Sequence, residues 1–93
     1  MGSKEKLIAR FKKQPKDFTY DEVVRLFSIF GYTESNKGST SGSRVEFVSR
    51  DGKDSYMMHK PHPSNTIKSY VMRQLLMYVK DNKLIEQYGQ NKK

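Results

Sequence analysis

The dipeptide Asp51-Gly52 lies between two short segments of alternating apolar and polar residues, and this pattern constrains the fold more than any other. Alternation on a period of two is typical of strands with one buried face, and it runs through 44–49 and 55–60. Asp-Gly favours a two-residue type I′ turn, because that turn requires positive φ at both central positions. The sequence therefore predicts a β-hairpin that turns at Asp51-Gly52.

A turn centred on this dipeptide also determines which residues face each other across the hairpin. The expected core face is formed by Val45, Phe47, Tyr56 and Met58. On the opposite face, Glu46 is expected opposite Met57, and Arg44 opposite His59. A register shift of one residue would exchange the two faces, so the position of the turn decides which side chains meet solvent.

The clearest helix start is at Thr19, which is followed three residues later by Glu22. In a capping box the threonine hydroxyl accepts a hydrogen bond from the glutamate amide, and the glutamate carboxylate accepts one from the threonine amide. The apolar residues that follow have the spacing of one buried helical face, and they are Val23, Leu26, Phe27 and Phe30. Gly31 is expected to end this helix in the left-handed conformation.

Two shorter elements are predicted on either side of this helix. An amphipathic helix is expected over 3–13, and Pro15 should end it, because the residue before a proline avoids the helical region. A short strand is expected at 32–35. The residues that follow, 36–43, are too rich in glycine and serine to be regular, so we expect a loop there.

The C-terminal third of the chain predicts a second long helix after the hairpin. Ser64 or Asn65 is the expected N-cap. The helix should break near Asn82 and resume briefly over 83–88, and the polar residues 89–93 are expected to fray. Four methionines are expected to fill gaps in the core, and they are Met57, Met58, Met72 and Met77.

The predicted element order is helix, helix, strand, strand, strand, helix. The fold class expected from it is α+β, with a three-stranded antiparallel sheet and helices on one face. The 93 residues are expected to form a single domain, 1–93. The other face of the sheet would then be free to meet a ligand.

Charge narrows the classes of partner. The chain has 18 Lys plus Arg against 10 Asp plus Glu, a formal net charge of +8. Nucleic acid, an acidic protein and an anionic membrane surface are the polyanions such a chain could bind, and a basic bias without function is the alternative. The absence of cysteine excludes a disulfide scaffold, a thiolate zinc site and a cysteine nucleophile. No apolar run has membrane-spanning length and no signal-peptide core is visible, so we expect a cytoplasmic protein.

The loop from Lys37 to Arg44 is one candidate binding segment. Its backbone amides, its hydroxyl side chains, including Ser39 and Ser43, and its flanking cations suit phosphate oxygens. It lacks the GKS or GKT sequence of a P-loop, which argues against nucleotide hydrolysis. The alternative is a solvent loop without function.

The segment from His59 to Pro63 is the other candidate. His59 and His62 are three residues apart, but a third and a fourth ligand are missing, so we expect no metal site. His59 is predicted beside Arg44 on the open face of the sheet. There it could act as a general base or acid on RNA without a metal ion.

Four segments of the chain together resemble HicA-type mRNA interferase toxins over roughly 18–79. The segments are 20–27 ending in Phe30-Gly31-Tyr32, then 37–39, then 42–47, and finally Pro61-His62-Pro63 with 67–76. In the family, a Gly-Ser pair that opens the second strand is followed within two positions by the catalytic histidine. Gly42-Ser43 match that pair, but Arg44 and Val45 occupy the two positions.

This resemblance implies a double-stranded-RNA-binding-domain-like fold with a family-like core over 18–79. It also implies ribosome-independent cleavage of mRNA and neutralisation by a HicB-type antitoxin that covers the active surface. The extra N-terminal helix and the longer loop depart from the family pattern. His59 is the candidate that remains for the catalytic role, helped by Arg44 and Lys37.

Three functions stay open from the sequence: an RNA-cleaving toxin, a module on the same fold that binds RNA without cutting it, and an interaction protein with an acidic partner. The candidate RNA-binding residues are Lys37, Ser39, Ser43, Arg44, Lys60 and His62. No cofactor, metal or membrane contact is expected.

Overall fold

The computed structural model describes residues 3–35, 44–61 and 64–91. Its elements are α1 (Ser3–Lys12), α2 (Tyr20–Ile29), β1 (Tyr32–Ser35), β2 (Arg44–Ser49), β3 (Ser55–His59), α3 (Ser69–Asp81) and α4 (Leu84–Asn91). The predicted α+β fold and element order are confirmed, and α4 is the helix expected after the break near Asn82. Because α4 extends to Asn91, its backbone is helical within the segment that was expected to fray.

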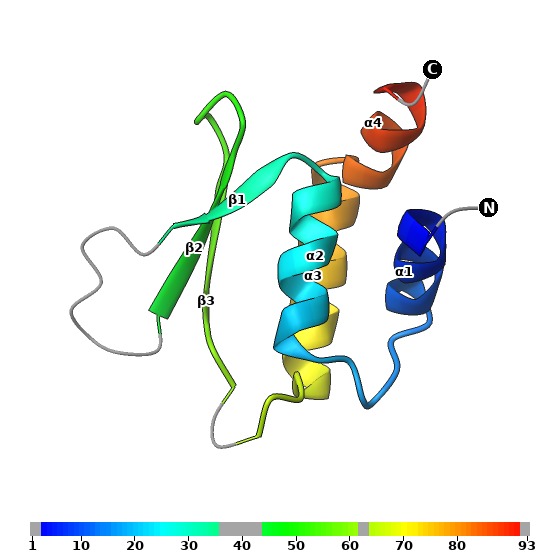
Figure 1. The fold of residues 1–93 in the computed structure, drawn as a ribbon, viewed down its shortest axis with the longest axis vertical. Helices are drawn as coiled ribbons and strands as arrows, with labels where there is room; N and C mark the ends of the chain where they lie inside the picture. The colour runs from blue at the N-terminus through cyan, green and yellow to red at the C-terminus, as the bar shows by residue number, and fades with distance from the viewer. Residues whose placement is uncertain (1–2, 36–43, 62–63, 92–93) are drawn as a thin grey trace.

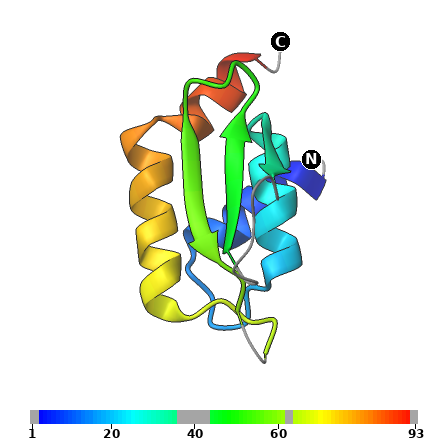
Figure 2. The same cartoon turned by 90° about the vertical axis from the view of Figure 1, so that its left-hand side faces the viewer.

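The elements form layers, with the sheet on one side of the molecule. The sheet is antiparallel with the order β1-β2-β3. Helices α2 and α3 cover one of its faces, and α1 lies on the far side of these helices from the sheet (Figure 1). Figure 2 shows the left-hand side of Figure 1 turned to the viewer, and no helix of the described ranges lies in front of the sheet there. We call the face that the helices cover the inner face, and the opposite one the outer face.

The predicted hairpin register is confirmed, but the predicted turn type is wrong. Arg44 pairs with His59, and Phe47 pairs with Tyr56. The loop spans residues 50–53, because the Ser49 amide donates to the carbonyl oxygen of Asp54 at 2.8 Å. Gly52 has φ +75°, whereas Asp51 is not in the positive-φ region that a type I′ turn needs.

The longer turn is stabilised by its own polar side chains. The Asp51 carboxylate accepts from the Ser49 hydroxyl at 2.6 Å and from the Lys53 amide at 3.0 Å. These hydrogen bonds favour the ionised carboxylate and lower the pKa of Asp51. The loop is still centred on Asp51-Gly52, so a four-residue turn produces the same pairing as a two-residue turn would have done.

The start of α2 has the predicted capping box. The Thr19 hydroxyl accepts from the Glu22 amide at 3.3 Å, and the Glu22 carboxylate accepts from the Thr19 amide at 2.9 Å. The same carboxylate accepts from Arg10 of α1, with 2.8 Å between Nε and Oε2. The cap therefore also fastens α1 to α2. Gly31 follows the helix with φ +89°, as predicted.

The start of α3 differs from the prediction. Neither Ser64 nor Asn65 caps the helix; the N-cap is Lys68, which makes no side-chain cap hydrogen bond. The carbonyl oxygen of Asn65 instead accepts from the Tyr20 amide, and the Ile67 amide donates to the carbonyl oxygen of Phe18. The segment before α3 thus pairs with the segment before α2. Because of this long-range pairing, α3 begins later in the chain than predicted.

The core lies between the inner face of the sheet and the helices. The Phe27 ring of α2 stacks on the Phe47 ring of β2, with 4.5 Å between centroids and 12° between ring planes. Tyr32 and Tyr56 also pack around the Phe27 ring, with centroid distances of 5.3 and 5.8 Å. A second aromatic pair, Phe11 with Phe18, joins α1 to this core. Both phenylalanines of that pair are fully buried.

The four methionines divide between core and surface. Met58 and Met72 are buried, as expected for core residues. The prediction is wrong for Met57 and Met77, which are 53% and 63% exposed. Met57 is on the outer face of β3, where no helix covers it, and Met77 is on the solvent side of α3.

Candidate functional site

The outer face of the hairpin presents three groups that could act on a phosphodiester. Antiparallel partners share a face, so Arg44 and His59 lie on the same side as the pair Glu46 and Met57. The inner face is reserved for the buried residues Val45, Phe47 and Met58. Strand alternation alone therefore brings a guanidinium, a carboxylate and an imidazole onto the face of the sheet that no described helix covers.

Arg44 and His59 are close neighbours across the strands. Hydrogen-bonded and non-hydrogen-bonded pairs alternate along an antiparallel ladder. Ser49 and Asp54 form a hydrogen-bonded pair, so the pair of Arg44 and His59, five positions along, is a non-hydrogen-bonded one. In such pairs the Cα atoms are only about 4.5 Å apart. Both side chains are exposed, and a ligand could reach both together.

The Arg44 side chain lies along the outer face towards Met57. Its Nη1 atom approaches the Met57 sulfur at 3.9 Å, a weak contact with a neutral acceptor. The guanidinium keeps most of its donors available, because it has five N–H groups. Within the described part of the chain no carboxylate pairs with Arg44. An incoming anion would therefore not have to displace a salt bridge there.

Lys60 follows β3 but is directed to the helix side. Its ammonium lies 5.7 Å from the centroid of the Tyr20 ring at the start of α2. The Tyr20 hydroxyl donates to the Glu34 carboxylate at 2.7 Å, and burial together with this carboxylate raises the pKa of Tyr20. Lys60 is thus near the end of the hairpin but does not share the face of His59.

The remaining predicted binding residues lie outside the described part of the chain. They are Lys37, Ser39, Ser43 and His62. Of the six predicted RNA-binding residues, the structure therefore places only Arg44 and Lys60, and it places them on different sides of the hairpin end.

The sheet region carries no net charge, despite the basic composition of the chain. Over 32–35 and 44–61 the basic residues are Arg44, Arg50, Lys53 and Lys60. The acidic residues of the same ranges are Glu34, Glu46, Asp51 and Asp54, so the formal charges cancel with histidine neutral. The outer face therefore offers individual charged groups at fixed positions rather than a strongly positive field.

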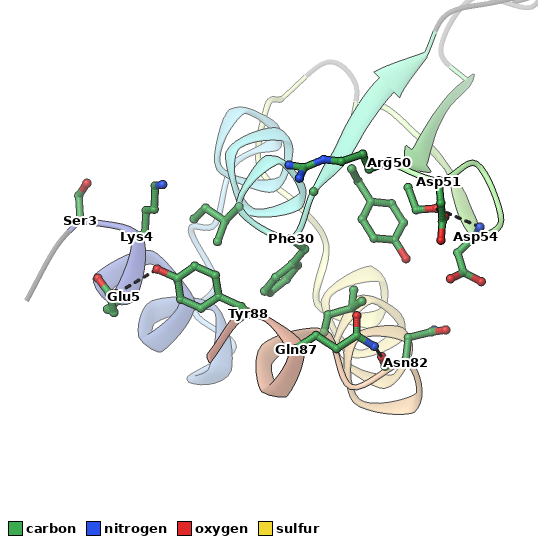
Figure 3. A pocket seen from close by; sticks show the side chains of 15 residues that line it. Ser3, Lys4, Glu5, Phe30, Arg50, Asp51, Asp54, Asn82, Gln87 and Tyr88 are labelled. Carbon is green, nitrogen blue, oxygen red and sulfur yellow. Dashed lines mark hydrogen bonds between the residues drawn. The ribbon is translucent and has the colours of Figure 1, made fainter. Parts of the chain in front are cut away.

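A groove of about 1070 Å³ lies at the opposite end of the hairpin, between the turn, α1, α4 and the end of α2. Figure 3 shows Arg50 and Lys4 beside it, together with acidic side chains at the turn. A hydrogen bond from the Tyr88 hydroxyl of α4 to the Glu5 carboxylate of α1, at 2.9 Å, joins two of its walls. This groove could not be predicted from the sequence, because its walls come from segments far apart in the chain.

Among the residues that the structure describes, no group of three or more His, Asp or Glu side chains is arranged to hold a metal ion. No helix in the described ranges is long and apolar enough to cross a membrane. Glu46 was not among the predicted site residues, although its position two residues from Arg44 indicates that both side chains lie on the same face of the strand. No family model, curated protein or solved structure matches this chain.

Proposed function

We propose that this protein binds RNA on the outer face of the hairpin and cleaves it, as the toxin of a type II toxin–antitoxin pair. The observation that carries the proposal is the presence of Arg44, Glu46 and His59 on the face that no helix of the described ranges covers. Cleavage of RNA by its own 2′-hydroxyl requires a base, an acid and a cation near the phosphate, and these three side chains supply one of each.

The proposed step is a transphosphorylation. The Glu46 carboxylate accepts the proton of the 2′-hydroxyl, whose oxygen forms a new bond to phosphorus. The bond from phosphorus to the 5′-oxygen breaks, and the His59 imidazolium donates its proton to that leaving oxygen. The Arg44 guanidinium stabilises the negative charge that builds up on the phosphoryl oxygens. The products are a 2′,3′-cyclic phosphate and a 5′-hydroxyl end, and no water enters this step.

The strand geometry supports this division of roles. Arg44 and His59 are direct cross-strand neighbours, while Glu46 pairs with Met57 and is therefore diagonal to His59. Diagonal neighbours on one face are about 7–8 Å apart. That separation leaves room for a phosphodiester between base and acid. Met57 lies beside the three groups and is exposed, so a nucleobase could pack against it.

The proposed partner is a HicB-type antitoxin that covers the outer face and neutralises the protein. The proposed compartment is the cytoplasm, where mRNA is the substrate. Growth arrest on induced expression, relieved by coexpression of the protein encoded by a neighbouring antitoxin gene, is the expected result. If expression of the wild-type chain and of His59→Ala slowed growth equally, toxicity would not depend on the proposed site.

A direct test uses purified protein and an unstructured oligoribonucleotide in buffer with a chelator. Wild-type protein should produce 2′,3′-cyclic phosphate ends, and His59→Ala, Arg44→Ala and Glu46→Gln should each cut about 10²–10⁴-fold more slowly. The matched controls are Arg73→Ala and Glu86→Gln, which change exposed residues of α3 and α4. Full activity of the three site variants, or equal loss in the controls, would contradict the proposal.

A second candidate function is RNA binding without cleavage. It is favoured by one observation: in the described part of the chain, no side chain hydrogen-bonds the His59 imidazole, whereas catalytic histidines are commonly oriented by such a partner. This function predicts salt-sensitive binding that Arg44→Ala weakens, with the oligoribonucleotide recovered intact. Product analysis on the same samples separates the two functions.

A further inference from the structure

Half of the net charge of the protein comes from one short segment at its N-terminal side. Residues 4–17 contain six basic and two acidic side chains, a net charge of +4 out of +8. The basic residues are Lys4, Lys6, Arg10, Lys12, Lys13 and Lys16. The sheet region, which carries the proposed cleavage site, is neutral by comparison. The positive field of the molecule is therefore concentrated around α1 rather than around the hairpin.

The helix separates these charges from its apolar residues. Leu7, Ile8 and Phe11 of α1 are buried against the core. Lys6 projects from the opposite side of α1. Lys13 directly follows the helix, and its amide donates to the Arg10 carbonyl oxygen at 3.1 Å. Both lysines are exposed, and so are Lys12 and Lys16. The result is a group of exposed lysines along α1 and in the segment that directly follows it.

These lysines differ from Arg10, which belongs to the fold. The guanidinium of Arg10 forms salt bridges with Asp17 at 3.0 Å and Glu22 at 2.8 Å. Within the described ranges, residues 4–17 make these two salt bridges, and Arg10 is the basic partner in both. The ammonium groups are thus available to an external anion, while Arg10 holds the helix in place.

We propose that the exposed lysines of α1, together with Lys13 and Lys16, form a second RNA-binding surface, which holds the phosphate backbone without reading sequence. The inference rests on the proposed function, because it assigns RNA as the polyanion. Counterion release from phosphates by Lys and Arg supplies most of the affinity in non-specific binding of nucleic acids. The outer face would then supply the reacting groups, and α1 would supply most of the electrostatic attraction.

The structure favours RNA over the two other polyanions that the composition allows. An interfacial membrane helix inserts its apolar side into the lipid, but that side of α1 is already packed in the core. Protein interfaces are anchored by buried aromatic or arginine residues, and lysine is depleted from them. The exposed side of α1 offers Ala9 as its apolar residue, among lysines. Flexible lysines without an apolar anchor suit a phosphate backbone.

The two surfaces lie on opposite sides of the protein. Figure 1 is viewed down the shortest axis, and α1 and the sheet are separated along the horizontal direction, that of the intermediate extent of 31 Å. A short oligonucleotide could occupy only one surface at a time. A longer strand could contact both by passing around the α2 and α3 layer, and its affinity should therefore gain from α1 more than that of a short strand.

The test measures how RNA affinity depends on salt. The probe is a fluorescein-labelled 2′-O-methyl oligouridylate, which lacks the attacking hydroxyl and stays intact, titrated by anisotropy at several NaCl concentrations. The test variant combines Lys6→Gln, Lys12→Gln and Lys13→Gln. The control combines Lys53→Gln, Lys80→Gln and Lys83→Gln, which remove the same charge from the hairpin turn, the last turn of α3 and the residue before α4. Circular dichroism confirms that both variants are folded.

Losing three phosphate contacts should lower the slope of log K against log salt by about 2, at ~0.7 per contact for a single strand. The control should lower it by less than half as much. Equal losses in the two variants would overturn the inference, because only net charge would then matter. A second result would also overturn it: the test variant loses binding to phosphatidylglycerol vesicles, while its salt slope for RNA equals that of the control variant. Loss of cleavage is not the readout, so failure of the proposed catalytic site leaves this result interpretable.

Discussion

The eleven residues of β2 and β3 alternate between the two faces of the hairpin, and the two faces differ in burial. On the inner face, Phe47 is fully buried beneath the Phe27 ring. On the outer face, Met57 is 53% exposed and Arg44 and His59 meet solvent. The comparison teaches that one alternating sequence can place the residues that stabilise the fold on one face and the candidate site residues on the other.

The largest expected effect tests the stabilising face. Phe47→Ala should lower the free energy of unfolding by about 3–5 kcal/mol, because it removes a large buried ring and leaves a cavity beneath Phe27. Urea denaturation followed by circular dichroism measures the change. A loss below about 1 kcal/mol would mean that the inner face is not the main source of stability, and the comparison would fail.

The second effect concerns the helix that covers the inner face. Thr19→Ala removes the acceptor for the Glu22 amide at the start of α2 and should cost about 1 kcal/mol. Ser64→Ala is the matched control, since Ser64 accepts from the Thr66 amide in a local turn and caps no helix. The two variants are compared by urea denaturation. An equal or larger loss in Ser64→Ala would show that the cap has no special weight.

The third prediction is a pH dependence at the same cap. The Arg10 hydrogen bond, followed by the backbone hydrogen bond from Thr19, lowers the pKa of Glu22 in the folded protein. A carboxyl whose folded pKa is depressed contributes stability above its unfolded pKa, and this contribution is lost as pH falls through the folded pKa. Wild-type protein should therefore lose more stability than Glu22→Gln between about pH 5 and the acid range.

Unfolding midpoints in urea, measured at neutral and acidic pH for both proteins, check this prediction. The difference between wild type and Glu22→Gln should be largest at neutral pH and should shrink on acidification. Parallel curves across the whole range would indicate that the carboxylate is not ionised and paired in the way that its contacts imply.

The smallest expected effect on stability is on the outer face. Met57→Ala should change the free energy of unfolding by no more than about 0.5 kcal/mol, because the side chain is largely exposed. It should still alter RNA binding or cleavage, since Met57 contacts Arg44 and lies beside Glu46 and His59. Unfolding in urea and cleavage assays on one preparation provide both readouts. Destabilisation comparable to that of Phe47→Ala would remove the distinction between the faces.

The sequence was sufficient to predict features whose partners are close along the chain. The capping box at Thr19 and Glu22 is confirmed, because both hydrogen bonds join residues only three apart. The register of the hairpin is confirmed as well, since it depends on where the turn is centred and not on how many residues it contains. Asp51 and Gly52 mark that centre even though their conformations differ from the predicted ones.

Features with distant partners could not be predicted in the same way. Ser64 and Asn65 have the residue types of an N-cap, but the Asn65 carbonyl pairs with Tyr20, which is 45 positions earlier. No local pattern announces that pairing. The groove beside α4 has the same origin, because Tyr88 reaches Glu5 from the other end of the chain. The sequence also leaves it open which methionines are covered.

The candidate site was predicted in part. The neighbouring positions of Arg44 and His59 follow from the register alone. The separation of Lys60 from them depends on Tyr20, which belongs to another element and draws the ammonium to the helix side. The amphipathic character of α1 was predicted from the sequence, and the burial of Leu7, Ile8 and Phe11 confirms it.

The hydrogen bond between Tyr88 and Glu5 brings residues near the two chain ends together at 2.9 Å. The two side chains are 83 positions apart along the chain. The chain entropy lost when a loop closes grows with the logarithm of its length, so this contact closes a costlier loop than any turn of the hairpin. We therefore expect it to form late in folding, so that Tyr88→Phe should speed unfolding more than it slows folding.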